Sequence, residues 1–414
     1  MGSLQNIIST AKGIKNVDNS DLKNPKQWLL NNWGISNDSG IRVSEKTALA
    51  CMAYQRGVDL LAGHIATQPK HLYRRTSTRG KEVARDHSLH QLISRRPNLY
   101  QNSYQFHYYL VVNLIMRGNF YAYINRNSFY EPVSLIPIAP FMVEPKIQKN
   151  RKVFKIDGAK RLYTNNEILH VYGMTLDGVK GINPIKYASQ TLGLGLAAEK
   201  MQSSAFGKGL HAGGVITMPE EHKGLMGSTD EEADSYMKAV RESFRKIYQN
   251  GPDSWHEVMF LEPGWAFKQF ELNLETAKII ETRKFGVADI ARLLGVPLHK
   301  LMDLDKATMT NIEQQGIEYV QDGILPRTIN IEHEFCSKLL KEDEQNEYFI
   351  KYNVDGLMRA SLKDRYEAYS IALGKNAPGF MSPGEIRDLE DLGEKNESEL
   401  FKPDNMNKQD YVAA

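Results

Sequence analysis

The chain has few cysteines and no long apolar run. Its 414 residues include only Cys51 and Cys336, so neither a disulfide framework nor a cysteine-based zinc site is expected, and a reducing compartment fits. The most apolar stretch, residues 108–116, is far shorter than the roughly 20 residues that cross a bilayer. We therefore expect a soluble protein with no membrane partner.

Sequence motifs for catalysis are also missing. The chain has no G-x-x-x-x-G-K-[ST] phosphate loop and no G-x-S-x-G nucleophile turn. His256-Glu257 and His333-Glu334 each lack the second histidine of a zinc-binding H-E-x-x-H motif. We predict that the protein is not an enzyme, with no catalytic residue, no cofactor and no metal site.

Residues 193–198 match the G-x-G-x-x-A form of a dinucleotide-binding fingerprint. That motif needs a strand directly before it, whereas residues 185–191 continue a helix that begins at Pro184. Small residues inside a helix favour close packing against a second helix, and this is the interpretation we prefer.

Charge is nearly balanced but unevenly distributed. The chain has 52 Lys+Arg and 50 Asp+Glu, which argues against a protein that grips nucleic acid electrostatically. Residues 341–414 contain 10 basic and 16 acidic side chains, so the C-terminal part forms an acidic unit. Residues 70–96 are the most basic stretch, and a turn at residues 77–80 predicts an exposed β-hairpin arm there. This arm is either a solvated sheet edge, which we favour, or a phosphate-binding surface.

Periodicity predicts the first half of the fold. Helices are expected at residues 4–14, at 44–68 ending before Pro69, and at 103–117 ending at Gly118. Strands are expected at 120–125, 152–156 and 167–172, with Asp157-Gly158 as a hairpin turn. A tyrosine cluster at positions 100, 104, 108 and 109 is either a stacking platform for bases or, as we favour, part of the core.

The centre of the chain predicts a helical hairpin that carries an insert. One long helix begins at Asn183-Pro184 and runs to about Gly207, and the other runs from Asn273 to Gly295. The insert between them should contain a strand at 215–218, a helix at 230–248, and strands at 257–261 and 266–271.

A polar stretch follows, at residues 298–311, and then a helix over about 312–340 that Pro326 should kink. The acidic end should hold a helix at 362–373 and another that starts at Ser382-Pro383. Together these elements predict an α+β fold.

The order of many short motifs resembles the bacteriophage portal protein family, of the compact siphophage type, over nearly the whole chain. Each motif is weak alone, and their joint order carries the resemblance. The motifs are Arg96-Pro97-Asn98, Gly118-Asn119-Phe120-Tyr121-Ala122, Glu167-Ile168-Leu169-His170, Gly181-Ile182-Asn183-Pro184-Ile185, Ala291-Arg292-Leu293-Leu294-Gly295-Val296-Pro297, Asn311-Ile312-Glu313-Gln314, Leu325-Pro326 and Ile386-Arg387.

The resemblance implies a portal-type arrangement of segments. These are a wing (1–182), a stem of two helices (183–209 and 271–297), a small α/β clip (210–270), a tunnel loop with a kinked helix that returns to the wing (298–355), and a helical crown with a C-terminal tail (356–414).

The resemblance also implies a homo-oligomeric ring, usually of twelve subunits, at one capsid vertex of the virion. Double-stranded DNA would pass through it non-specifically during packaging and ejection. Its implied partners are the terminase large subunit, a head-tail adaptor and the major capsid protein, with assembly in the host cytoplasm. Twelve stems with helices about 10 Å apart would leave a bore of about 28 Å, wide enough for B-form DNA.

Two other functions stay open at this point. A DNA-binding enzyme, such as a nuclease or recombinase, would need clustered carboxylates with metal-ligand spacing, and none is visible in the sequence. An interaction scaffold that forms no ring would share the acidic end.

The resemblance places the stretch 298–311 at the narrowest point of the channel. Its side chains are mixed in sign, so they could touch a duplex without holding it. Of the basic residues, Lys300 and Lys306 would make weak phosphate contacts that the acidic ones offset. The expected lining residues are Lys300, Asp303, Asp305, Lys306, Thr308, Met309, Thr310 and Asn311.

Overall fold

The computed structural model describes residues 37–76, 80–207, 214–217, 238, 242, 266–269, 279–301, 309–358, 362–374 and 379–390. The chain divides into two compact units, Met1–Asn353 and Val354–Ala414. The expected helix at 4–14, the strand at 257–261 and most of the helix at 230–248 lie outside the described residues, although Lys238 and Glu242 are helical.

Two helices form where one was expected at residues 44–68. They are α3 (Glu45–Ala50) and α4 (Met52–Thr67), separated by the extended backbone of Cys51, at φ −72° and ψ 110°. Ala48 and Tyr54 are both buried. Each of the two helices therefore contributes a side chain to the core.

Helix α6 (Ser103–Arg117) packs against α4 and has the predicted bounds. Asn102 and Gln105 form a reciprocal capping box at its start, and Gly118, at φ 72°, ends it in the left-handed conformation that glycine adopts without strain. The expectation that the tyrosine cluster is core is wrong for two of its members. Tyr100, in the loop before α6, and Tyr104 are exposed, whereas Tyr108 and Tyr109 are half-buried and the ring of Tyr109 contacts the buried Phe120.

The basic stretch does form a hairpin, but that hairpin is not a free arm. Strand β1 (Lys70–Arg75) pairs with β2 (Lys81–Val83) on one side and with β11 (Tyr348–Tyr352) on the other, so β1 is the central strand of an antiparallel sheet. Helix α5 (Ser88–Ser94) follows and packs on β1. The sequence interpretation missed β11 because its partner strand lies more than 270 residues away.

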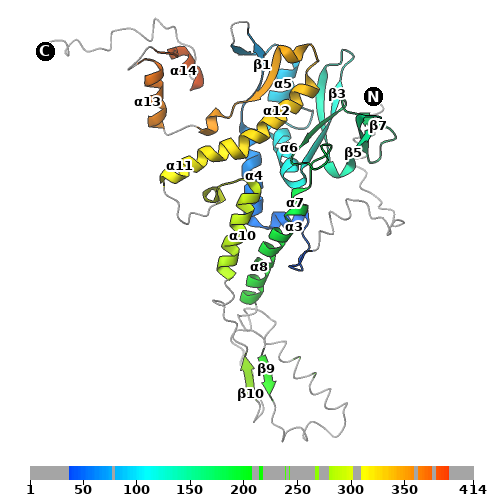
Figure 1. Ribbon diagram of the computed structural model, residues 1–414, viewed down its shortest axis with the longest axis vertical. Helices are drawn as coiled ribbons and strands as arrows, with labels where there is room; N and C mark the ends of the chain where they lie inside the picture. The colour runs from blue at the N-terminus through cyan, green and yellow to red at the C-terminus, as the bar shows by residue number, and fades with distance from the viewer. Residues whose placement is uncertain are drawn as a thin grey trace, which may run out of the picture. The chain divides into compact units, whose positions relative to one another are not determined.

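Two more antiparallel sheets complete this part of the fold (Figure 1). The first has the order β4-β3-β8, from Pro132–Ile138, Asn119–Arg126 and Ile168–Tyr172. The second has the order β5-β6-β7, from Val143–Gln148, Arg151–Ile156 and Leu162–Thr164. The three expected strands, now β3, β6 and β8, are present. Gly158, at φ 81°, lies in the turn from β6 to β7.

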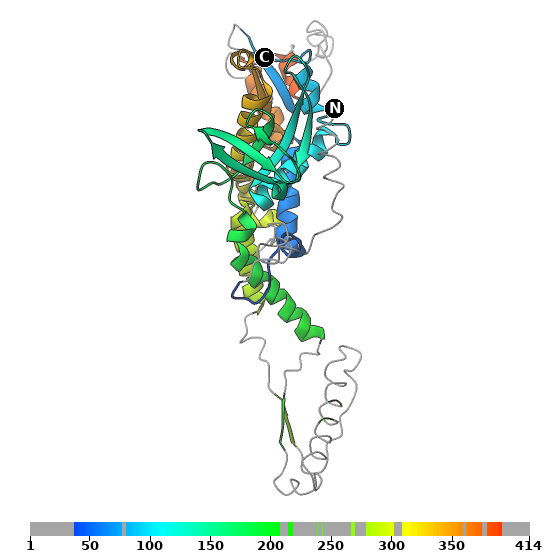
Figure 2. The ribbon, with the colours of Figure 1, turned by 90° about the vertical axis from the view of Figure 1, so that its right-hand side faces the viewer.

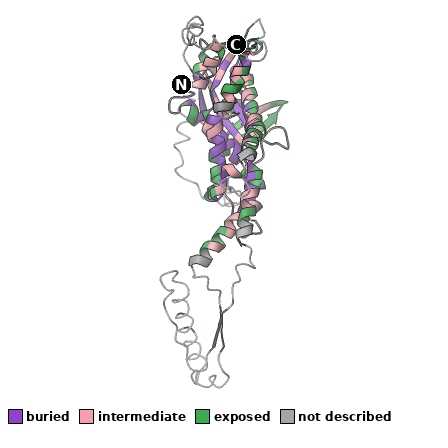
Figure 3. Cartoon of the chain, turned by 90° about the vertical axis from the view of Figure 1, so that its left-hand side faces the viewer, coloured by how far each residue is buried: buried purple, intermediate pink, exposed green. Residues whose placement is uncertain are grey.

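Buried side chains of these two sheets form one hydrophobic cluster, and Figure 3 shows the concentration of buried residues in this upper region. The cluster consists of Tyr121, Ile138, Val143, Phe154, Ile156, Tyr163 and Ile168. A short helix, η1 (Pro140–Met142), links β4 to β5 and so joins the two sheets.

The helical hairpin is formed by α7 (Pro184–Tyr187), α8 (Ser189–Gly207) and α10 (Ile279–Leu294), with α8 and α10 side by side (Figure 2). Asn183 caps α7 as predicted, since its side chain accepts a hydrogen bond from the Lys186 N–H. Ala188 interrupts the expected single helix. Strands β9 (Gly214–Thr217) and β10 (Ala266–Gln269) of the insert pair antiparallel.

The G-x-G-x-x-A segment lies within α8, as the context argument required. A Cβ atom built on Gly286 of α10 would lie 3.9 Å from the Cα of Gly195. The two helices therefore meet closely at a pair of glycines. This agrees with a packing role for the small residues and leaves no strand-to-helix turn for a dinucleotide.

A short helix, η4 (Leu298–Leu301), follows α10. The next described residues form a continuous run of helix, made of α11 (Met309–Glu318), the π-helical segment η5 (Tyr319–Ile324) and α12 (Leu325–Leu339). The chain then leads through η6 (Glu344–Asn346) to β11. The irregular segment lies directly in front of Pro326. Proline cannot donate to the carbonyl four residues earlier and its ring crowds that turn, and the Leu325 N–H instead reaches back five residues to Val320.

The C-terminal unit contains η7 (Asp355–Met358), α13 (Leu362–Ala372) and α14 (Pro383–Leu389). The predicted start of α14 is confirmed, because the hydroxyl of Ser382 accepts from the Glu385 N–H while the carboxylate of Glu385 accepts from the Ser382 N–H. Glu390 also accepts a hydrogen bond from Tyr369 and pairs with Arg365, which ties α14 to α13.

Candidate channel-lining segment

The expected channel segment is ordered at both ends. Residues 298–301 form η4 and α11 begins at Met309, three residues before the expected start of the next helix at about 312. Lys300 lies in η4, and Met309, Thr310 and Asn311 form the first turn of α11. Asp303, Asp305, Lys306 and Thr308 lie outside the described residues.

The segment leaves α10 through a well-defined helix end. Gly295, at φ 68°, follows the last helical residue, and its N–H donates to the Arg292 carbonyl. The Val296 N–H donates to the Ala291 carbonyl five residues back, and the side chain of Val296 is buried. This pair of bonds is a Schellman motif, in which glycine is favoured at the left-handed position. It fixes the direction in which the chain enters η4.

Arg327 of α12 donates to backbone carbonyls at two places, the end of α10 and the π-helical segment. Its Nη2 donates to the carbonyl of Leu294, the last residue of α10, at 3.0 Å, and its Nη1 donates to the carbonyl of Gly323 in the π-helical segment. Burial lowers the pKa of the Arg327 guanidinium, and Tyr319 partly offsets this. One side chain thus ties the end of α10 to the start of α12. Sequence reasoning did not predict this contact, because the partners are 33 residues apart.

Close backbone packing surrounds this tie. A Cβ on Gly323 would lie 2.9 Å from the Gly295 carbonyl oxygen, so only glycine fits without a shift. On α4, a Cβ on Gly57 would lie 2.3 Å from a methyl group of Leu294 and 3.5 Å from one of Leu301. Both leucines are buried. The first ordered turn of the channel segment therefore rests on α4 and on the π-helical segment.

Lys300 packs against the protein here. Its ammonium group lies over the ring of Tyr319, 5.3 Å from the centroid, and burial lowers its pKa. Tyr319 is also hydrogen-bonded through its hydroxyl to Nδ1 of His64 on α4, at 3.0 Å. Burial and then the charge of Lys300 lower the pKa of His64, which favours the neutral imidazole. Lys300 thus helps to anchor the segment, and its contact with phosphate stays a prediction.

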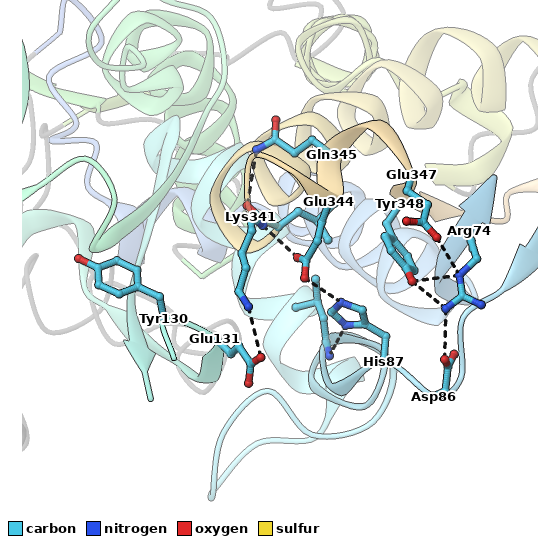
Figure 4. A network of polar contacts seen from close by, with 12 residues as sticks. Arg74, Asp86, His87, Tyr130, Glu131, Lys341, Glu344, Gln345, Glu347 and Tyr348 are labelled. Carbon is cyan, nitrogen blue, oxygen red and sulfur yellow. Dashed lines mark hydrogen bonds and ion pairs between the residues drawn. The ribbon is translucent and has the colours of Figure 1, made fainter. Parts of the chain in front are cut away.

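The basic stretch at 70–96 uses several of its charges within the fold. Lys70 is buried and donates to the Ala66 carbonyl. Figure 4 shows Arg74 between the hydroxyl of Tyr348, at 2.7 Å, and the carboxylates of Asp86 and Glu347. The contacts of Arg74 with Tyr348 and Glu347 tie β1 to β11 and the residue before it, so two of the eight basic side chains of this stretch have partners within the fold.

Among the described residues there is no group of three or more His, Cys, Asp or Glu side chains that could hold a metal ion. In that same part of the chain, no helix is both long enough and apolar enough to span a membrane.

Comparison with known proteins places this geometry in a family. The phage portal protein family model matches residues 52–391. A probable portal protein of Streptomyces phage phiC31 is 29% identical over 382 residues, which are 87% of this chain and 79% of that protein. The portal protein of Enterobacteria phage HK97 is 26% identical over 316 residues, covering 75% of this chain and 71% of that protein.

Solved structures show the same fold at lower sequence identity. An HK97-family phage portal protein from Corynebacterium diphtheriae superposes with a TM-score of 0.57 at 17% identity, over 76% of this chain and 96% of that one. A chain from the neck of an empty GTA particle superposes with a TM-score of 0.57 at 19% identity, over 88% of this chain and 95% of that one. With the family model spanning from α4 to the end of the described residues, the chain belongs to the phage portal protein family.

Proposed function

We propose that twelve copies of this chain form a ring at one capsid vertex, through which double-stranded DNA is packaged and ejected. The observation that carries the proposal is the family match over residues 52–391, which includes both stem helices and the anchored segment between α10 and α11. A structural relative from the neck of a native GTA particle, computed with C12 symmetry, superposes with a TM-score of 0.51 and supports twelve as the number of subunits.

An exposed apolar surface on the first unit supports contacts with other chains. Asn98 accepts hydrogen bonds from the N–H groups of Tyr100 and Gln101 and so fixes a loop that exposes Leu99 and Tyr100. Asn127 fixes the β3–β4 turn in the same way and exposes Phe129 and Tyr130. Exposed large apolar side chains favour contacts with other molecules, and we assign these two loops to contacts within the ring or with the major capsid protein.

The same family role assigns the remaining segments. Residues 1–182 are the wing, 183–209 and 271–297 the stem, 210–270 the clip, 298–355 the tunnel segment with its return to the wing, and 356–414 the crown and tail. The clip is the docking site for the terminase large subunit and later for the head-tail adaptor. Assembly takes place in the host cytoplasm and the ring then stays in the virion.

Native mass spectrometry of the purified chain tests the ring. We expect a single species with the mass of twelve copies, and negative-stain images with a central hole. A monomer at micromolar concentration, or a compact oligomer without a hole, would overturn the proposal and favour a scaffold without a ring.

The clip assignment is tested by removal of residues 210–270. This deletion should abolish terminase binding while the first unit still folds, and packaging by the variant at the normal level would contradict the assignment.

The channel assignment needs a test of its own. Lys306→Glu should change DNA retention or packaging efficiency without changing ring assembly, because it places a negative charge where the duplex passes. Lys180→Glu, at an exposed lysine in the β8–α7 loop, is the matched control and should leave both unchanged. Equal behaviour of the two variants would remove the basis for the assignment.

A further inference from the structure

The stem hairpin exposes large apolar side chains on one face. Leu194 of α8 is 54% exposed and Phe285 of α10 is 66% exposed. Each directly precedes a glycine of the helix contact, Gly195 and Gly286 respectively. In an α-helix the preceding residue is rotated by about 100° from the contact direction. Because the two helices run antiparallel, these rotations bring Leu194 and Phe285 to the same face of the hairpin.

The described chain begins directly beside this face. The side-chain amide of Asn37 donates to the Ser189 carbonyl at 2.8 Å, and Gln190 donates to the Asp38 carboxylate at 3.0 Å. A Cβ on Gly193 would lie 1.9 Å from Nδ2 of Asn37, so Asn37 sits against Gly193 with no room to spare. Leu194 is the next residue of α8. One residue corresponds to about 9 Å around the circumference of a helix.

The sequence just before Asn37 is rich in large apolar residues. Trp28, Leu29, Leu30 and Trp33 lie within six positions, and they include two of the four tryptophans of the chain. Trp33 and Asn37 are four positions apart in the sequence, so their Cα atoms lie at most about 14 Å from each other. Trp33 can therefore reach the face that carries Leu194 and Phe285 from the position at which Asn37 is held.

We propose that residues 28–33 cover this apolar face of the stem hairpin in their own chain. Indole rings bury a large apolar area and pack well on leucine and phenylalanine side chains. The short connection through Asn37 gives the segment a high effective concentration at its own stem, so it binds there in preference to a neighbouring copy. The segment then braces α8 against α10, and the proposal does not depend on the number of subunits in the ring.

Cysteine cross-linking of the full chain tests the proposal. In a Cys51→Ser, Cys336→Ser background, Trp33→Cys with Leu194→Cys should form a disulfide within one chain, visible as faster migration on a non-reducing gel. Trp33→Cys with Leu176→Cys, an exposed position in the β8–α7 loop, is the control and should stay reduced. Cross-linked dimers with Leu194→Cys would show that the segment covers a neighbouring stem, and the absence of any cross-link would refute docking on this face.

A fluorescence measurement gives an independent check. In a Trp255→Phe, Trp265→Phe background the emission comes from Trp28 and Trp33 alone. The double variant Leu194→Ser, Phe285→Ser should shift this emission to longer wavelength and raise its quenching by acrylamide, whereas Leu176→Ser should change neither. Identical spectra for all three proteins would overturn the proposal.

Discussion

Replacement of Arg327 by methionine should loosen the point at which the channel segment leaves the stem. The guanidinium makes two charge-assisted bonds, to the carbonyls of Leu294 and Gly323, and each such bond contributes about 1.5 to 3 kcal/mol net. Methionine keeps an apolar stem of similar length but cannot donate. Because the guanidinium is only partly buried and water can replace some of the lost bonding, the low end of the range applies, about 3 kcal/mol for the pair.

This free energy sets the change in the local opening equilibrium. A loss of about 3 kcal/mol corresponds to about a 150-fold increase in the opening equilibrium. Hydrogen exchange should accordingly speed up by about two orders of magnitude at the amides of Gly295 and Val296, which close the Schellman motif. The amides of α6, which packs elsewhere, serve as the internal reference. Arg327→Lys keeps the charge but not the fork of donors, so it should give an intermediate effect.

Two results would refute this reasoning. Unchanged exchange at residues 295 and 296 would mean that the two bonds do not hold the end of α10. An equal increase across α6 would mean that the variant weakens the whole unit and that Arg327 has no local role at the junction.

Three further substitutions test other parts of the first unit. Gly118→Ala should lower the melting temperature much more than Gly178→Ala, because both sites have a positive φ but only at Gly118 would the Cβ lie 1.8 Å from a backbone oxygen, that of Ile182; equal effects would rule out the steric cause. Burial lowers the pKa of His107 to about 3, so as the pH falls the unfolded chain takes up a proton on this imidazole before the folded chain does, and the free energy of unfolding decreases between about pH 6.5 and pH 3. In urea unfolding, His107→Phe should reduce this decrease by up to about 1.4 kcal/mol per pH unit, and an unchanged slope would contradict the assignment. Arg117→Met should lower the free energy of unfolding by about 2 to 4 kcal/mol, because it leaves the half-buried carboxylate of Glu45, to which Arg117 donates at 2.6 and 2.7 Å, without its partner. Glu45→Gln should lower it by less, and equal losses for the two variants would argue against a charged pair.

The parts of the fold that sequence reasoning predicted are those set by local chemistry. Helix α6 was found with its true bounds, because Asn102, Gln105 and Gly118 are cap residues whose effect depends on neighbours within one turn. The start of α14 at Ser382-Pro383 was found for the same reason.

Errors arose where distant partners decide the structure. Strand β1 was predicted at a free edge, yet β11 pairs with it from the far end of the unit and places the ring of Tyr352 against Lys70 and the hydroxyl of Tyr348 against Arg74. The tyrosine cluster was assigned to the core because apolar residues lie beside it in the sequence, but periodicity alone does not tell which face of a helix meets its neighbours, and Tyr100 and Tyr104 are exposed.

The same distinction applies to the candidate site. Gly295-Val296-Pro297 indicated where α10 ends, and Pro326 indicated an irregularity in the next helix. Neither showed that Arg327 joins the two, since that contact exists only once the end of α10 lies next to the start of α12. The contact of the Lys300 ammonium group with Tyr319 likewise depends on the tertiary fold and has no local sequence signal.

The two helical ends narrow the part of the channel segment that lies outside the described helices to residues 302–308. The helical residues end at Leu301 on one side and resume at Met309 on the other, which leaves residues 302–308 between two fixed ends. The sequence of that interval has Asp303, Asp305 and Lys306, one more negative than positive charge. If this interval lines the ring, as proposed, it should repel phosphate weakly. Under the proposed function, Lys306→Glu should therefore act by strengthening an existing repulsion, and its effect on DNA retention should decrease as ionic strength rises.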